Sequence, residues 1–245
     1  MGTRILALVG AAGGVGTTRL AVEFGALLAS TDQDVAIVDA AFTTQGLSSY
    51  IADSITKDAT ALATGEATLE EALYSHDADV SGTLSVCPAR APFERQSRAK
   101  TAGAAERFER QLAATSLSHD VVIVDTPPVG SNPALGAVNA ADRIAIVTRP
   151  TERGSDAVAL TQERLADIGR EADAIIANHA GKDVQSRADA HVPASDVRSP
   201  RNAPACLPPQ GEFSRAVVDA LETILERPLE IDVSEPGRFD RFKPS

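Results

Sequence analysis

A glycine-rich segment joins a short apolar run to a helical pattern at the start of the chain. Residues 4–9 read Arg-Ile-Leu-Ala-Leu-Val and residues 10–16 read Gly-Ala-Ala-Gly-Gly-Val-Gly. Apolar side chains then recur at helical spacing, at Leu20, Val22, Phe24, Leu27 and Leu28. Strand, glycine-rich loop and helix in this order are typical of a phosphate-binding loop. The order predicts a site for a nucleotide triphosphate.

The loop carries most of the groups that such a site needs. Its glycines let backbone N–H groups face phosphate oxygens, the next helix adds its positive dipole end, and a hydroxyl binds magnesium. The position where a lysine would reach the terminal phosphates holds a threonine instead. The residues expected to contact the nucleotide are Gly13, Gly14, Val15, Gly16, Thr17 and Thr18, with the Thr18 hydroxyl on Mg²⁺.

Strand and helix patterns alternate along the chain. Strands are predicted at 4–9, 34–39, 83–87, 120–125, 143–148 and 172–178, and helices at about 17–30, 68–74, 94–117, 133–140, 153–169 and 212–226. Several strands are near-continuous Val/Ile runs, as expected for parallel strands covered on both faces. The fold class is therefore predicted as α/β: a doubly wound, mostly parallel sheet flanked by helices on both faces.

The same patterns suggest how the chain is organised. We expect one domain over residues 1–227, with a long surface loop at 181–209 that holds a short strand near residues 191–192. Residues 228–245 are expected to form a flexible tail. No run reaches eighteen apolar residues and no secretory signal precedes the first strand, so a cytoplasmic location is expected.

Composition limits the classes of partner. The chain of 245 residues has a net charge of −11 and four lysines against nineteen arginines, which suggests adaptation to a salt-rich, halophilic cytoplasm. An ordinary acidic cytosolic protein is the alternative. A diffuse negative surface argues against tight DNA binding by charge alone. Cys87 and Cys206 lie in no metal-ligand spacing, so both are expected to be buried and inert.

Two further strands end in aspartate. Asp39 closes the run Asp-Val-Ala-Ile-Val-Asp, and Asp125 closes the similar run Asp-Val-Val-Ile-Val-Asp before Thr-Pro-Pro. A carboxylate beside a phosphate-binding loop holds the magnesium ion or its water shell. Either aspartate alone could instead cap the next helix. Together with the loop they predict a magnesium site formed by Thr18, Asp39 and Asp125.

With these motifs the chain resembles the MinD/ParA branch of the deviant P-loop NTPases. The loop of that family reads Gly-Lys-Gly-Gly-x-Gly-Lys-Thr-Thr, and residues 11–19 align with it without a gap. Further similarity lies at 39–48, 64–73, 125–128 and 147–151, and the resemblance spans about residues 3–226. It implies a switch protein that binds Mg-ATP and acts in intracellular positioning or partition. It also implies that Asn178 pairs with the adenine edge, although an ordinary turn asparagine is an equal alternative.

The chain departs from the family where the chemistry should be. The first loop glycine is Ala11, the signature lysine is Ala12, and the P-loop lysine is Thr17. The second acidic position after the second strand, which the family associates with activation of water, is Ala41. Asp39 is then the one family-matched candidate for a catalytic role. Nucleotide binding is expected, with hydrolysis slow or lost.

Other cations and surfaces complete the expectations. Arg19 is predicted to point away from the pocket, and solvent is the favoured place for Arg149 and Lys182, although both lie in loops near it. The basic run 90–110 is interpreted as the outer face of a helix, with contact to DNA as the alternative. Residues 238–243 are too short to bind a membrane alone.

Two functions remain open at this point. The first is the nucleotide-dependent switch, active as a homodimer. The second is a pseudo-NTPase scaffold that no longer binds nucleotide and pairs with an active paralogue as a heterodimer.

Overall fold

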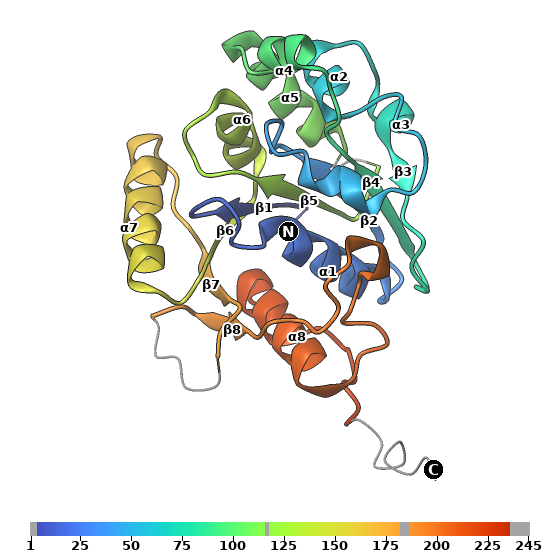
Figure 1. Ribbon diagram of the computed structural model, residues 1–245, viewed down its shortest axis with the longest axis vertical. Helices are drawn as coiled ribbons and strands as arrows, with labels where there is room; N and C mark the ends of the chain where they lie inside the picture. Colours follow the sequence, from blue (N-terminus) through green and yellow to red (C-terminus); the bar gives the residue numbers. More distant parts are fainter. Residues whose placement is uncertain (1–3, 116–117, 182–186, 236–245) are drawn as a thin grey trace.

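The computed structural model describes residues 4–115, 118–181 and 187–235. Its centre is an eight-stranded sheet in the order β3-β4-β2-β5-β1-β6-β7-β8, in which β3 alone runs antiparallel to its neighbour (Figure 1). The strands are β1 Ile5–Gly10, β2 Asp34–Asp39, β3 Tyr74–Ser75, β4 Thr83–Cys87, β5 Val121–Thr126, β6 Arg143–Thr148, β7 Ala174–Asn178 and β8 Ala190–Val192. The predicted doubly wound, mostly parallel α/β sheet is confirmed.

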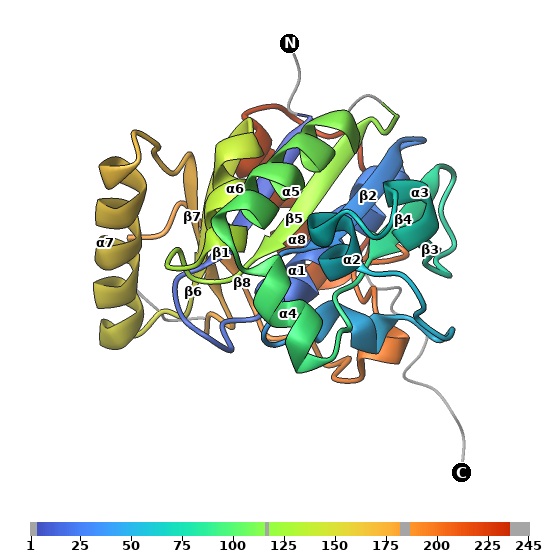
Figure 2. The same cartoon turned by 90° about the horizontal axis from the view of Figure 1, so that it is seen from above.

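Helices cover both faces of this sheet (Figures 1 and 2). They are α1 Thr17–Ala29, α2 Ala59–Thr64, α3 Leu69–Ala72, α4 Phe93–Ala99, α5 Ala102–Thr115, α6 Asn132–Ala140, α7 Glu152–Asp167 and α8 Gly211–Leu225, with 3-10 turns at Gly46–Tyr50 and Pro200–Asn202. The hydrophobic core accordingly consists of two clusters, one on each face of the sheet. Leu6 and Leu8 of β1 pack with α1 and α8, while Ile5, Ala7 and Val9 pack with α2, α5, α6 and α7.

The position of β1 explains where a ligand can bind. β1 lies between β5 and β6, so the chain reverses its winding direction at this strand. Open parallel sheets bind ligands at such a point, outside the carboxyl ends of the strands. The loop 11–16 leaves β1 at that edge, and β2 and β5 end beside it with Asp39 directly opposite Asp125.

Two helical regions differ from the sequence expectation. The single helix expected at 94–117 is divided into α4 and α5, because Thr101 begins a new helix by accepting the N–H of Ala104 on its hydroxyl. Residues 116–117 lie outside the described residues. The short helix α2 was not predicted, although Asp58 caps it by accepting the N–H of Ala61.

The expected surface loop at 181–209 contributes to the core. The short strand predicted near residues 191–192 is confirmed as β8, which pairs with β7. Farther along, Ala203 and Cys206 are buried on the α1 and α8 side, and Cys87 is buried as well, as predicted. The apolar positions of this segment lie between prolines and charges, which hides their role in the sequence.

The beginning of the expected tail is also ordered onto the core. Leu229 and Val233 are buried beside α8, so this part of 228–245 is not a free tail. Residues 236–245, with the basic aromatic stretch 238–243, lie outside the described residues. None of the described helices is long and apolar enough to span a lipid bilayer.

Candidate functional site

The loop between β1 and α1 adopts the conformation that its glycines allow. Gly14 and Gly16 have φ angles of 75° and 91°, in the left-handed region, and Gly16 directly precedes α1. A Cβ atom on Gly16 would lie 2.4 Å from Nδ2 of Asn178, so a side chain is excluded by space as well as by conformation. Gly13 and Gly14 are exposed at the tip of the loop, where their backbone can meet a ligand.

The three predicted magnesium-side groups come together below this loop. The Thr18 hydroxyl donates to Oδ2 of Asp125 at 2.6 Å, and Asp39 is the register partner of Asp125 on the next strand. Oδ1 of Asp39 accepts the N–H of Ala41 at 2.7 Å, and Oδ2 accepts the N–H of Ala89 at 3.3 Å. Neither aspartate caps a helix, so the alternative role as a helix cap does not apply to either of them.

Burial places both carboxyls in an environment that disfavours charge. Desolvation, and then the negative charge of Asp125, raise the pKa of Asp39 to about 8. Desolvation raises the pKa of Asp125 to about 6, against the lowering effect of the Thr18 hydrogen bond. No described Lys, Arg or His forms an ion pair with either carboxyl. The two acids therefore lack a counter-charge.

These groups fit a magnesium ion that arrives with a nucleotide. Mg²⁺ prefers hard oxygen ligands and keeps several waters and substrate phosphates in its shell. Within the described residues no cluster of three His, Cys, Asp or Glu side chains could hold a metal alone. A hydroxyl beside two carboxyls supplies part of a shell, and phosphate and water would supply the rest.

The positions of the missing lysines are filled by small side chains. Thr17 is buried, and its hydroxyl lies so close to Gly10 that a Cβ atom there would be 2.8 Å away. Its side chain therefore lies inside the loop, near the end of β1. Ala11 is buried and Ala12 is exposed. Neither can place a charge on a phosphate.

Two arginines near the loop behave differently. Arg19 pairs with Glu23 and donates to the carbonyl oxygen of Val197 at 2.8 Å, so it points away from the loop as predicted. Arg149, for which solvent was favoured, is exposed but also donates from Nη2 to the carbonyl oxygen of Gly14 at 3.1 Å. Lys182 lies outside the described residues.

Asn178 contacts the loop itself. Its Nδ2 donates to the carbonyl oxygen of Val15 at 2.8 Å, and its Oδ1 accepts the N–H of His179 at 2.9 Å. It is therefore more than a turn residue, and contact with an adenine stays a prediction. Burial, and then the charge of Arg149, lower the pKa of His179.

Sequence reasoning missed several contacts of the site. The Ala89 N–H on Asp39 and the Arg149 contact have no motif, because each joins segments far apart in the chain. Gly46 also packs against the site, and its being a glycine was a weak indication of this. A Cβ atom at Gly46 would lie 3.1 Å from the Thr18 hydroxyl oxygen.

The basic run 90–110 is largely bound within the molecule. Arg95 bonds to Asp58, Arg98 to Glu66, and Arg107 to the carbonyl oxygen of Ala63. These contacts favour the interpretation as a solvated helix face over a DNA-binding patch.

Comparisons with known proteins agree with this architecture. The sequence matches the AAA_31 family, described as an AAA domain, over residues 3–176. Among solved structures, the Pyrococcus furiosus cell division ATPase MinD is 21% identical with a TM-score of 0.78, covering 92% of this chain and 99% of its own. The septum site-determining protein MinD of Pyrococcus horikoshii OT3, complexed with Mg-ADP, is 20% identical with a TM-score of 0.76, covering 89% and 94%.

A partition protein has a similar fold. The putative plasmid partition protein of Borrelia burgdorferi B31, bound to AMPPNP, is 15% identical with a TM-score of 0.71, covering 92% of this chain and 99% of its own. No curated protein sequence matches. The AAA_31 match covers more than half of the chain, and the fold and the loop agree with it. The chain therefore belongs to the AAA_31 family, and it shares its fold with the two MinD structures and the plasmid partition protein.

Proposed function

We propose that this protein is a MinD/ParA-type switch that binds Mg-ATP and hydrolyses it slowly or not at all, and that it acts in intracellular positioning or partition. The observation that carries the proposal is the 2.6 Å contact between Thr18 and Asp125, with Asp39 in register beside them. These are the magnesium-side parts of a nucleotide site, and they lie under a glycine loop of the right shape. The solved relatives named above support the same ligand class.

The residues that would hold the ligand follow from the geometry. Backbone N–H groups of residues 13–18 and the start of α1 would face the phosphates. Thr18 would bind the magnesium ion, with Asp125 and Asp39 acting directly or through water. The bound ion supplies positive charge to the phosphates and to the two buried carboxyls. Asp39 and Asp125 would then hold the ion in their ionised forms, which its counter-charge would favour.

The missing lysines weaken this site by an amount that can be bounded. One charge pair at about 4 Å is worth about 4 kcal/mol at an effective dielectric near 20, or about a thousandfold in affinity. At molar salt the Debye length is about 3 Å, so exposed pairs lose much of this value and the backbone cradle carries a larger share. Salt does not screen the charges of a transition state inside a closed site, so the loss of the lysines has its full effect there. Hydrolysis is therefore affected more than binding, and Ala41 has no group that could orient a water.

The pseudo-NTPase scaffold is the second candidate. The buried position of Thr17, inside the loop, favours it, because nothing at residues 11, 12 or 17 reaches toward a phosphate. In that case a second copy, or an active paralogue that carries the family lysines, would be the constitutive partner. Co-purification with a partner in the absence of nucleotide supports this candidate.

Calorimetric titration of the purified full-length protein with Mg-ATP, in high salt, tests the proposal. Wild type is expected to bind, and Thr18→Ala is expected to bind about tenfold or more weakly, because the magnesium ligand is lost. Thr223→Ala is the matched control, since its hydroxyl bonds to Asp219 of its own helix. No binding by the folded wild type refutes the switch and leaves the scaffold.

Phosphate release from the same samples separates binding from turnover. Wild type is expected to release phosphate at a rate near background. Thr17→Lys is expected to tighten Mg-ATP binding, because it restores a cation at the position that reaches the terminal phosphates. If Thr17→Lys changes neither binding nor phosphate release, the loop has diverged by more than its lysine.

A further inference from the structure

A cleft of about 380 Å³ opens at the carboxyl edge of the sheet, next to the buried aspartates. Its walls include residues 40–44 and part of 127–133, segments that begin one residue after Asp39 and two residues after Asp125. Two cationic side chains line it, Lys100 and Arg164, and no acidic side chain of the described residues does so. The cleft thus combines positive charge with a position at the sheet edge where β2 and β5 end in Asp39 and Asp125.

The two cations come from outside the P-loop. Arg164 of α7 donates from Nη1 to the carbonyl oxygen of Val129 at 2.6 Å, which holds its guanidinium against the segment after β5. Its other N–H groups have no acceptor among the described residues, so they can serve a ligand. Lys100 is half-buried and forms no ion pair with any described residue. A side chain placed this way has no counter-ion among the described residues and can pair with an incoming anion.

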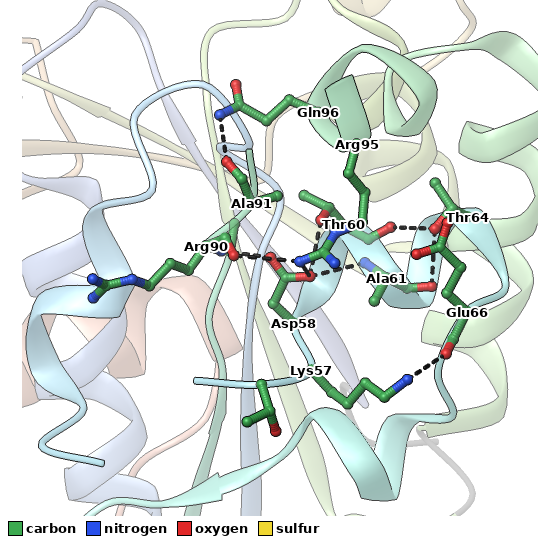
Figure 3. Close-up of polar contacts among 12 residues, drawn as sticks. Lys57, Asp58, Thr60, Ala61, Thr64, Glu66, Arg90, Ala91, Arg95 and Gln96 are labelled. Atoms are coloured by element: carbon green, nitrogen blue, oxygen red, sulfur yellow. Dashed lines mark hydrogen bonds and ion pairs between the residues drawn. The ribbon is translucent and has the colours of Figure 1, made fainter. Parts of the chain in front are cut away.

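The backbone at Lys100 is fixed by contacts on both sides. Lys100 directly follows α4, and its carbonyl oxygen accepts Nδ2 of Asn132 at 2.8 Å, which ties it to the start of α6. Five residues earlier, Arg95 bonds to the buried carboxylate of Asp58 at 3.2 Å and to the hydroxyl of Thr60 at 3.0 Å (Figure 3). Asp58 also accepts the N–H of Arg90 at 2.6 Å. This network, seen in Figure 3, anchors α4 to α2, and α4 leads directly into Lys100.

The start of α6 adds to the positive potential of the cleft. Ser131 and Pro133 line it, and the Ser131 side chain makes no capping hydrogen bond to the helix. The first N–H groups of a helix left in this state attract anions. Arginine offers a planar fork for phosphate oxygens and lysine a compact charge, so the pair suits a tetrahedral oxyanion.

We propose that Lys100 and Arg164 form an oxyanion subsite, which supplies within one chain the positive charge that Ala12 and Thr17 lack. Its ligand is a phosphate group, either the terminal phosphate of the bound nucleotide or free inorganic phosphate. The nucleotide version rests on the proposed function. The free-phosphate version does not.

Calorimetry on the full-length chain with Mg-ATP, Mg-ADP and inorganic phosphate, at constant ionic strength, tests the subsite. The variants are Lys100→Gln and Arg164→Gln, with Arg153→Gln as the control, since Arg153 is exposed on the same helix as Arg164. Each of the two variants is expected to weaken Mg-ATP binding by about tenfold, the value of a charge-assisted hydrogen bond, and to leave Mg-ADP within about twofold. Lys100→Arg is expected to recover most of the loss, which separates charge from folding.

The three ligands distinguish the source of the phosphate. If Lys100→Gln and Arg164→Gln bind Mg-ATP more weakly than wild type but bind Mg-ADP equally well, the ligand of the subsite is the terminal phosphate of the nucleotide. If both variants lose binding of inorganic phosphate while their binding of both nucleotides is unchanged, the ligand is free phosphate. If wild type binds no nucleotide but binds phosphate through these side chains, the proposed switch fails and the subsite stands.

Two results overturn the subsite. The first is equal binding of all three ligands by wild type, Lys100→Gln and Arg164→Gln. The second is the finding that wild type binds neither Mg-ATP nor inorganic phosphate. Circular dichroism of each variant verifies folding, and Arg164→Met replaces Arg164→Gln if the latter does not fold.

Discussion

Asp39→Asn should stabilise the metal-free protein increasingly as the pH rises. Burial, and then the negative charge of Asp125, raise the pKa of Asp39 to about 8 in the folded protein, from an ordinary value of 3.8. Between these two values the folded protein keeps a proton that the unfolded chain releases. The folded state therefore loses stability relative to the unfolded chain as the pH rises from about 4 to about 8, the reverse of a salt-bridged aspartate.

The size of the effect follows from the linkage relation. Each pH unit in this window lowers the contribution of Asp39 to the free energy of unfolding by about 1.4 kcal/mol, as expected for one retained proton. Asparagine does not titrate, so the stability difference between variant and wild type grows by about 3 kcal/mol from pH 5 to pH 7. The asparagine amide also replaces the oxygen that accepts the N–H of Ala89, which costs about 1 kcal/mol equally at each pH.

Urea unfolding followed by circular dichroism measures this difference, at pH 5, 6 and 7 with a chelator and constant salt. Asp156→Asn, an exposed aspartate on α7, is the control and should differ from wild type by the same amount at each pH. Parallel curves for Asp39→Asn and wild type would mean that Asp39 is ionised in the folded protein, and the reasoning from burial would be wrong. Saturating Mg-ATP, if it binds, should reduce the effect because the ion stabilises the carboxylate.

Two further substitutions test the packing around the site. Gly16→Ala should cost about 2 kcal/mol or more in urea unfolding, because a Cβ atom there meets Asn178 at a positive φ, whereas Gly103→Ala has open space on α5 and should be neutral or stabilising. A loss for Gly16→Ala no larger than that for Gly103→Ala contradicts the geometry. Glu23→Ala should cost about 3 kcal/mol, because it removes the acceptor of two buried N–H groups. Glu163→Ala, on the exposed face of α7, is its control, and equal stability of these two variants rules out the role assigned to Glu23.

Local patterns were enough to predict the central fold. Buried parallel strands such as β2 and β5 are continuous apolar runs that end in aspartate, and the glycine loop marks the start of α1. For the same reason the magnesium-side groups Thr18, Asp39 and Asp125 could be placed at one edge of the sheet. Their pairing in register is a consequence of parallel strands ending together.

Long-range contacts were not predictable from these patterns. Asn178 and Arg149 reach the loop from strands β7 and β6, and nothing in the spacing of either residue encodes its partner. The segment after β8 has prolines and charges that indicate a loop, yet Ala203 and Cys206 are buried because tertiary packing selects single positions in it. The spacing of apolar residues identifies helices and strands, but it cannot identify single buried residues within a loop.

The acceptor role of Glu23 has a consequence for where this protein can be divided. The family match ends at residue 176, but the carboxylate of Glu23, in the first helix, is satisfied by backbone donors at 205 and 206. A fragment that stops at the family boundary would lose those donors, and the buried Glu23 carboxylate of α1 would keep only its ion pair with Arg19. The smallest autonomous unit thus extends at least thirty residues beyond the recognised family segment, and truncation at that boundary is expected to yield an insoluble or unfolded product.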